Sequence, residues 1–543
     1  MNMMAMDNQP FSIAEDQGFI ELLAHVQPKY MIPSRRYFSD VMLPKTFKEI
    51  KARLLAQLDE IHAPHVSFTS DIWTSQHSVE SFISLTAHWV DEEFQRCSGV
   101  LSAQHFPGSH TAENIDQMVS KMMREWEISE ERQHILVRDG ASNMALGLRL
   151  ANVASVHCFL HILDLVVKDS IFSQRTIIDL CAKVRRIATH FNHSSLARNE
   201  LKNLQAEQGI NLPLFPVQDV STRWNSTLNE WNLCEKILRI LQPFFEITKQ
   251  VSSEKSTLGD VIPHVVALDR YLSKHGHDSG VQTTKTEIRN ALRQRLLSCL
   301  PNKLNVKDDK NYVITTVVDP RYKLKFLNNK ESAKKWLLEE MQLQAAVAPA
   351  NTNTHAADED NNTQEAAGLA GNKPIEGETA ARRRRDTNAP KSLKEEIHID
   401  FLKCYDEVSS AEESSDDEES CREEENSERD QTYDQTEVSR VRRKKPKGPS
   451  LSELASEVDR YTLTPTVERC KDPLSFWREE KSVYPTIAKV ARRYLSCPAS
   501  SVYSERLFSE AGNVFEEHRA RLLPRNGEQL LFLHHNLPRF PNC

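Results

Sequence analysis

Residues 60–170 carry the pattern that most constrains the fold, because strand-like runs and helical repeats follow one another there in a fixed order. A helical repeat follows Thr111, which is a suitable N-cap, and helices also follow two later strand-like runs. The order of three strands, a helix, a strand, a helix, a strand and a helix predicts a mixed α/β sheet with helical crossovers. The predicted strands are His65–Ser70, Ser81–Val90, Cys97–Phe106, His134–Val137 and Ser155–His157.

Most of the remaining folded chain is expected to be helical. Only 15 of 543 residues are glycine, against a usual share of about 7%, which excludes collagen-like and glycine-rich classes. Helical periodicity runs through residues 176–344 and returns over 472–540 with proline punctuation. No run approaches the roughly 18 apolar residues of a membrane span, and Met1–Pro10 does not resemble a secretory signal, so we expect no membrane partner.

The net charge of −8 originates in one acidic tract. Residues 406–430 hold 13 acidic and 2 basic side chains, a net of −11, which leaves about +3 for the rest of the chain. We therefore expect residues 345–450 to be a disordered acidic insert, with a short helix near Leu393–Tyr405.

Two basic runs lie in this insert. The first is Arg382–Arg385, and the denser second run includes Arg442, Arg443, Lys444 and Lys445. Such runs indicate nuclear import or nucleic-acid contact, and the alternative is a solvated charge run. The density of the second run favours nuclear import there.

The ten cysteines form no CxxC pair. Scattered single cysteines in a chain of this size indicate reduced, intracellular thiols. Zinc ribbons and paired-ligand fingers are excluded, and the spacing identifies no zinc site.

Two aspartates follow predicted strands, Asp71 in SDIWTS and Asp139 in RDGASN. Adjacent strands lie about 5 Å apart, so two such carboxylates could not both stay ionised cheaply without a cation between them. Mg²⁺ suits this arrangement, and a two-metal site could displace a phosphodiester. The alternative for each aspartate alone is a turn former or helix N-cap.

A third acid, Glu505, lies on a predicted helix with Phe508, Ala511 and Phe515 on its buried side. The alternative is a surface glutamate paired with a neighbouring arginine.

Seven stretches, spread in order over nearly the whole folded chain, together resemble the hAT family of DNA transposases, and in particular the zinc finger BED domain-containing proteins. The last stretch resembles the family's C-terminal dimerisation signature. The stretches are PSRRYF (33–38), SDIWTS (70–75), RDGASNM (138–144), CFLHILDLVV (158–167), STRWNST (221–227), VVDPRYKLKFL (317–327) and PASSVYSERLFSEAGNVFEEHRARLLP (498–524).

The resemblance implies a fold that is α/β plus all-α: a ribonuclease-H-like mixed sheet core, interrupted by a large helical insertion domain and carrying the disordered acidic insert. The expected divisions are an N-terminal helical segment (1–60), the first part of the core (61–175), the insertion domain (176–344), the insert (345–450) and the dimerisation region that completes the core (451–543).

The resemblance also implies that Asp71, Asp139 and Glu505 bind catalytic Mg²⁺ or Mn²⁺. The family's CxxH pair corresponds to Cys158 and His161 near the active site. A zinc site there would need two more ligands, none of which stands at useful spacing, so a structural role is favoured.

The insertion-domain tryptophan of the family corresponds to Trp224, beside Arg223, and both are expected to contact DNA. In active members this tryptophan stacks on a flipped base. Packing between helices is the alternative role of Trp224.

The chain departs from the family's pattern in three ways. No cysteine precedes Cys97, so the BED-type finger is absent, and the sequence is expected to be a fragment, a finger-less paralogue or an incomplete gene sequence. Gly140 stands where family members commonly have asparagine. Arg138 abuts the second acid, and its cation could compete with metal if it points inward.

Two functions follow from these observations. The first is a nuclear, domesticated, transposase-like regulator that binds DNA and dimerises without cutting, and the second is an active metal-dependent transposase or nuclease. Both have DNA and the chain itself as partners and neither has a small-molecule substrate. Clustered leucines predict an interface or, equally well, burial within the chain: Leu522, Leu523, Leu530, Leu531, Leu533 and Leu537.

Overall fold

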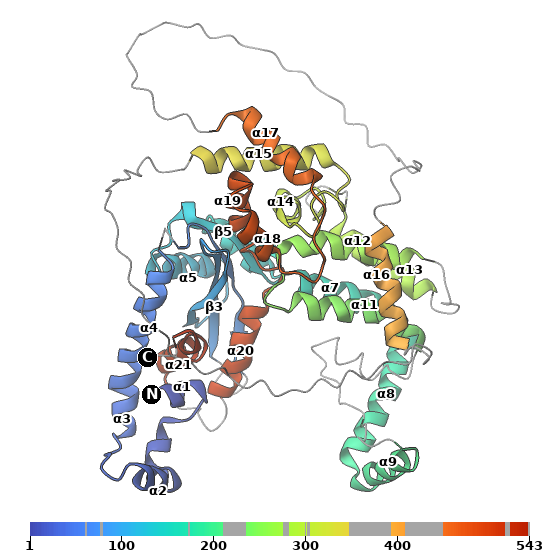
Figure 1. Cartoon of the computed structure of the whole chain (residues 1–543). Helices are drawn as coiled ribbons and strands as arrows, with labels where there is room; N and C mark the ends of the chain where they lie inside the picture. The colour runs from blue at the N-terminus through green and yellow to red at the C-terminus, as the bar shows by residue number, and fades with distance from the viewer. Residues whose placement is uncertain are drawn as a thin grey trace, which may run out of the picture.

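The computed structural model describes residues 1–59, 62–75, 80–171, 174–209, 215, 235–274, 282–298, 300, 304–346, 393–407, 449–515 and 522–540. A mixed sheet lies beside a large helical domain, and helices α8 (Arg175–His193) and α9 (Ser195–Glu207) extend away from both (Figure 1). In the described ranges, no helix combines the length and the apolar content that a membrane span needs.

Six described strands form one sheet, in which β4 and β1 pair with opposite edges of β3. Strand β1 runs antiparallel to β3 and parallel to β5, and β5 runs parallel to β6. This mixed sheet with crossover helices confirms the expected ribonuclease-H-like fold class. The strands are β1 (Val66–Thr69), β2 (Ile72–Thr74), β3 (Ser81–Val90), β4 (Arg96–His105), β5 (Gln133–Arg138) and β6 (Ser155–His157).

Strand β2 is the one described strand that the sequence pattern did not predict. It spans three residues, which is too short to show a period, and it exists because it pairs with the first residues of β3. Strand β1 pairs with residues farther along β3, so β1 and β2 line the same edge of that strand. Ser70 and Asp71 form the break between β1 and β2. The acidic residue Asp71 therefore lies between two strands that pair with the same edge of β3.

Two helices make the crossovers between the parallel strands. Helix α5 (Ala112–Glu125) begins at the predicted N-cap Thr111, whose hydroxyl accepts the Asn114 N–H, and α6 (Ser142–Leu150) connects β5 to β6. Helices α5 and α6 pack against each other at Gly147, where an added Cβ would lie 2.7 Å from the Cβ of Ile115. The close approach requires the absence of a side chain at this position.

The C-terminal helices complete the core of the sheet. Helix α20 (Val502–Val514) packs on β3, and α21 (Pro524–Asn536) packs on β4. Leu530, Leu531 and Leu533 are buried in the same hydrophobic cluster as the strands. Of the two roles expected for these leucines, burial within the chain is the one that the structure shows, and an interface at this segment stays a prediction.

The N-terminal helices lie against the C-terminal ones, so the two chain ends are close together (Figure 1). Both α1 and α4 pack on α21. The N-terminal elements are α1 (Asn2–Met6), η1 (Phe11–Glu15), α2 (Gln17–Val26), α3 (Arg35–Tyr37), η2 (Phe38–Met42) and α4 (Leu43–Gln57).

The helical domain continues from the last strand through α7, and its hydrophobic cluster includes one side of the sheet through Ile135, Val137 and Val156. Helices of the C-terminal block also pack into it, with α19 lying on α14 and α15. Besides α8 and α9, its elements are α7 (Phe159–Ile171), α11 (Glu235–Val251), η5 (Leu258–Asp260), α12 (Val261–Ser273), α13 (Gln282–Leu296), α14 (Lys310–Val318), α15 (Lys330–Ala346), α16 (Leu393–Asp406), α17 (Leu451–Leu463), α18 (Pro473–Glu480) and α19 (Pro485–Tyr494).

Helix α16 confirms the short helix expected near Leu393–Tyr405. It is not part of a disordered segment, because it packs on α11 and α12 and buries Ile397, Phe401 and Tyr405. These apolar side chains recur at helical spacing and give the helix a core-facing side. Most of the remaining insert, including both basic runs, lies outside the described residues.

Candidate metal centre

The two aspartates predicted from strand ends lie side by side. In the parallel pair of β1 and β5, Thr69 stands opposite Val137, so Asp71 and Asp139 each follow two residues later. Both therefore lie at the carboxyl ends of adjacent strands. The register of the sheet, and no local motif, brings them together.

Local hydrogen bonds hold each aspartate in place. Asp71 Oδ1 accepts the N–H of Ile72 at 2.9 Å, and Asp139 Oδ1 accepts the N–H of Ala141 at 3.2 Å. The Asp71 N–H in turn donates to Ser84 Oγ on β3 at 3.0 Å. Each carboxylate thus has the turn-forming role that was expected as the alternative to metal binding. Among the described contacts this role uses Oδ1, and Oδ2 accepts no hydrogen bond.

The carboxyl of Asp71 is electrostatically crowded. Burial is the main cause that raises its pKa to about 6, and the negative charge of Asp139 is the next. Glu505 raises the pKa further, while the Ile72 N–H and His161 lower it. Asp71, Asp139 and Glu505 therefore lie close enough to interact, and a cation between them would relieve the repulsion.

Glu505 reaches this region because the start of α20 is fixed to the sheet. Ser504 Oγ lies 2.7 Å from Thr69 Oγ1, at the end of β1. The Ser501 N–H donates to Cys158 Sγ at 3.3 Å, which joins α20 to the start of α7. Glu505 follows Ser504 directly, in the first turn of the helix.

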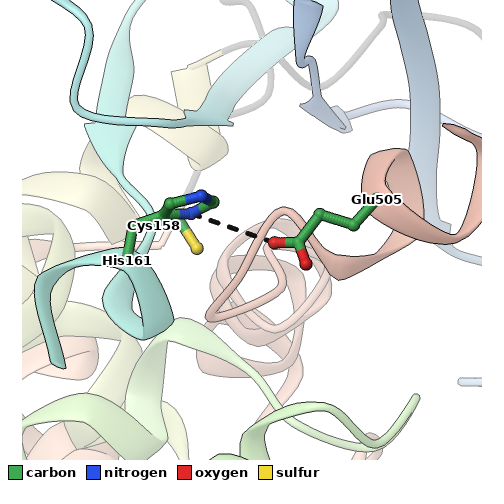
Figure 2. A group of neighbouring side chains, drawn as sticks. All are labelled: Cys158, His161 and Glu505. Carbon is green, nitrogen blue, oxygen red and sulfur yellow. Dashed lines mark ion pairs between the residues drawn. The ribbon is translucent and has the colours of Figure 1, made fainter. Parts of the chain in front are cut away.

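Cys158 and His161 approach Glu505 from the start of α7. Figure 2 shows the two side chains together, with Glu505 pointing toward them from α20. One ligand atom from each of the three residues lies within 4.8 Å of the other two, and His161 Nδ1 is 3.9 Å from Glu505 Oε1. Glu505 is the additional ligand that sequence spacing could not identify, because it belongs to a distant helix.

His161 brings a positive charge to this cluster. Its contact with Cys158 is the main cause that raises its pKa to about 9, against the opposing effect of burial. Glu505 and Asp71 raise it further. The imidazole is therefore protonated at neutral pH and forms an ion pair with Glu505.

Arg138 does not point toward Asp71. Its Nη1 donates to the Asp139 carbonyl at 2.7 Å, and its Nε donates to Ser155 Oγ at 3.3 Å. The side chain lines a cavity of about 460 Å³ together with His157 and Arg295. The predicted competition between its cation and metal is not supported by this orientation.

His157, which the sequence analysis missed, accounts for the glycine at position 140. A Cβ on Gly140 would lie 2.7 Å from both Cε1 and Nε2 of His157. The imidazole therefore occupies the space that an asparagine side chain would need. The unusual glycine was the available signal, but it did not identify its partner.

The other predicted site residues fall in parts of the chain that the structure does not describe. Trp224, Arg223 and the basic residues Arg442, Arg443, Lys444 and Lys445 lie outside the described residues. Among the described cysteines, Cys97, Cys158, Cys404, Cys470 and Cys497 are free thiols.

Three family models match the chain in succession. They are the ZBED1 RNase-like domain over residues 69–161, the ZBED1 RNase-like helical domain over 156–256, and the hAT family C-terminal dimerisation region over 457–537. Asp71 and Asp139 fall in the first, and Glu505 falls in the last.

Similar proteins cover nearly all of the chain. Zinc finger BED domain-containing protein 4 from Homo sapiens is 27% identical over 99% of this chain and 43% of its own length. A Zea mays protein named as a candidate AC transposase is 23% identical over 95% of this chain and 62% of its own length. The protein tpeD of Talaromyces stipitatus, named as a candidate transcriptional regulator, is 21% identical over 96% of this chain and 59% of its own length. The chain spans about half the length of the curated relatives it matches.

Proposed function

Because this chain is a hAT-transposase-like protein of the zinc finger BED domain-containing group, we propose that it binds DNA and holds a divalent metal at Asp71, Asp139 and Glu505 for phosphodiester cleavage. The observation that carries the proposal is the convergence of these three acids from β1, β5 and α20. They come from distant parts of the chain, and after burial, which is the main cause, the charges of Asp139 and Glu505 also raise the pKa of Asp71.

The donor atoms fit a hard divalent cation. All three residues offer carboxylate oxygens, which Mg²⁺ and Mn²⁺ prefer, and Mg²⁺ commonly keeps waters and phosphate oxygens as further ligands. A bound ion would activate water and stabilise the charge that develops on the leaving oxygen. The fold supplies the rigidity, since Asp71 and Asp139 are fixed by hydrogen bonds to neighbouring N–H groups.

Cationic side chains near the acids support DNA as the substrate. Arg138 and Arg295 line the cavity next to Asp139. Helix α8 exposes Lys183 and Arg186 on the arm that extends from the body (Figure 1). Positive side chains on both sides would contact the phosphate backbone, whose charge supplies most of the sequence-independent affinity of DNA-binding proteins.

Self-association is the second part of the proposal and follows from the dimerisation region over residues 457–537. Since Leu530 and Leu531 are buried within the chain, the contact would use side chains that are still exposed. In the described part of that region these are Leu463, Val483 and Leu523.

One observation favours a second candidate function, a nuclear DNA-binding regulator without cleavage. The His161 cation lies 3.9 Å from Glu505, where it neutralises charge that a metal would otherwise balance. The name of tpeD as a candidate transcriptional regulator agrees with this role, and the basic run at Arg442–Lys445 would serve nuclear import.

A plasmid-nicking assay separates the two functions. The full chain is incubated with supercoiled plasmid in Mg²⁺ or Mn²⁺ beside Asp139→Asn, and Asp164→Asn serves as a matched control because Asp164 lies on α7 and pairs with Lys168. If the protein cleaves DNA, the wild type and the Asp164→Asn control should nick the plasmid in the presence of metal. Asp139→Asn should not. Plasmid that stays intact while the protein retards it on a gel would overturn the cleavage proposal and favour the regulator.

A further inference from the structure

We propose that Cys158, His161 and Glu505 form a site for Zn²⁺ with three protein ligands and an open fourth position. The site shares Glu505 with the proposed catalytic acids, but its other donors come from α7. Two of its residues stand at i and i+3 at the start of that helix, and the third reaches them from α20 (Figure 2).

The donor set selects a borderline or soft ion. A thiolate, an imidazole and a carboxylate are the three ligand types of protein zinc sites, whereas Mg²⁺ and Ca²⁺ prefer oxygen donors alone. Three protein ligands with one open position are typical of zinc sites that remain accessible to water. The set therefore predicts an ion different from the one expected between Asp71 and Asp139.

The unliganded geometry is close to that of a bound site. The ligand atoms lie within 4.8 Å of one another, whereas donors around tetrahedral Zn²⁺ lie about 3.5 Å apart. Glu505 can close the difference, because its side chain is 35% exposed and has three rotatable bonds.

His161 and Cys158 already have the features of ligands. Nδ1 of His161 is buried and makes no hydrogen bond among the described residues, with Glu505 Oε1 3.9 Å away, so Zn²⁺ would take its place beside the glutamate once it displaces the imidazole proton. The Cys158 sulfur accepts the Ser501 N–H at 3.3 Å and stands at the N-terminal end of α7, so its position beside His161 is fixed from two elements. A backbone hydrogen bond from Cys158 N–H to the Arg138 carbonyl at 2.6 Å fixes the position of this residue.

Occupancy of this site would draw Glu505 away from Asp71 and Asp139. If the proposed function holds, zinc would inhibit DNA cleavage, because Zn²⁺ would compete with Mg²⁺ for the shared Glu505 carboxylate. This part of the inference rests on the proposed function. Zinc binding itself does not depend on cleavage, and it can be measured without DNA.

Cobalt spectroscopy on the full chain tests the site. Co²⁺ reports a thiolate ligand through a sulfur-to-metal charge-transfer band, and tetrahedral geometry through visible bands. We expect the wild type to show both at one equivalent, to lose them when Zn²⁺ is added, and to retain them in excess Mg²⁺. Cys158→Ser should lose the charge-transfer band.

Three further variants control this experiment. Cys470→Ser removes an exposed thiol outside the site and should retain the band, and Asp139→Asn should also retain it, which separates this site from the proposed Mg²⁺ site. His161→Gln, at a side chain that is 38% exposed, should lose the tetrahedral bands even if Cys158→Ser does not fold. A wild type without the bands, or bands that persist in both Cys158→Ser and His161→Gln, would overturn the proposal.

Discussion

At the scale of the residue, Asp71 shows how the fold creates a reactive environment. The sheet register places it beside Asp139, and burial together with that neighbouring charge raises its pKa to about 6. The protein therefore holds a carboxyl whose ionised form is less favourable than that of an ordinary aspartate, and a cation beside it would stabilise that form. Such an arrangement is typical of metal-binding sites and costs stability.

Substituting this residue should stabilise the protein. The pKa of Asp71 rises from 3.8 in the unfolded chain to about 6 in the fold, so its contribution to stability is present below pH 4 and is lost as the pH rises through 6. In metal-free buffer, Asp71→Asn should increase the free energy of unfolding at pH 7 by up to about 3 kcal/mol. Denaturant unfolding at pH 4 and pH 7 measures the difference, and an equal effect at both values would contradict the assigned pKa.

Residue-level features were only partly predictable. Asp71 and Asp139 could be identified because each follows a strand, and Cys158 and His161 because they match the CxxH pair of the family that the chain resembles. His157 could not be identified, since its contact with Gly140 depends on the packing of β6 beside β5. The orientation of Arg138 toward Ser155 was open for the same reason.

At the scale of the element, long periodic segments were predictable and short or partner-dependent ones were not. Helix α5 begins at the expected Thr111 cap, and β3 covers the expected residues. Strand β2 was missed because only its pairing with β3 creates it. Helix α16 was expected, but its burial depends on α11 and α12, which no local pattern reveals.

Two glycines with different surroundings give a paired prediction: Gly147 lies at the contact of α5 and α6, and Gly512 faces open space. Gly147→Ala would place a methyl group 2.7 Å from Ile115 Cβ and 2.8 Å from the Ala112 carbonyl oxygen, so it should destabilise the protein by about 1–3 kcal/mol. Gly512 lies on α20 with nothing within 4 Å of an added Cβ, so Gly512→Ala should stabilise it by about 0.5–1 kcal/mol. Thermal unfolding of both variants checks the pair, and shifts of the same sign would count against the described helix contact.

At the scale of the whole molecule, the candidate centre exists only when distant parts of the chain have come together. The sheet supplies Asp71 and Asp139, while α20 supplies Glu505 and buries Leu507 and Phe508 in the core of the sheet. The same C-terminal block packs on the helical domain through α19. Assembly of the acids is therefore linked to folding of both regions.

The resemblance of ordered motifs predicted this assembly, but composition and periodicity did not. Nothing in the local sequence of Glu505 distinguishes it from a surface glutamate. Its proximity to Asp71 follows from the contact of Ser504 with Thr69, which joins two segments far apart in the chain.

The central claim is that Asp71, Asp139 and Glu505 form one divalent-metal site, and Mn²⁺ binding tests it most directly. Electron paramagnetic resonance of free Mn²⁺ gives the affinity of the wild type, Asp139→Asn and Glu505→Gln without any DNA. We predict that each variant, although its residue lies on a different element, weakens Mn²⁺ binding by at least about tenfold. Binding of equal strength by all three proteins would contradict the claim.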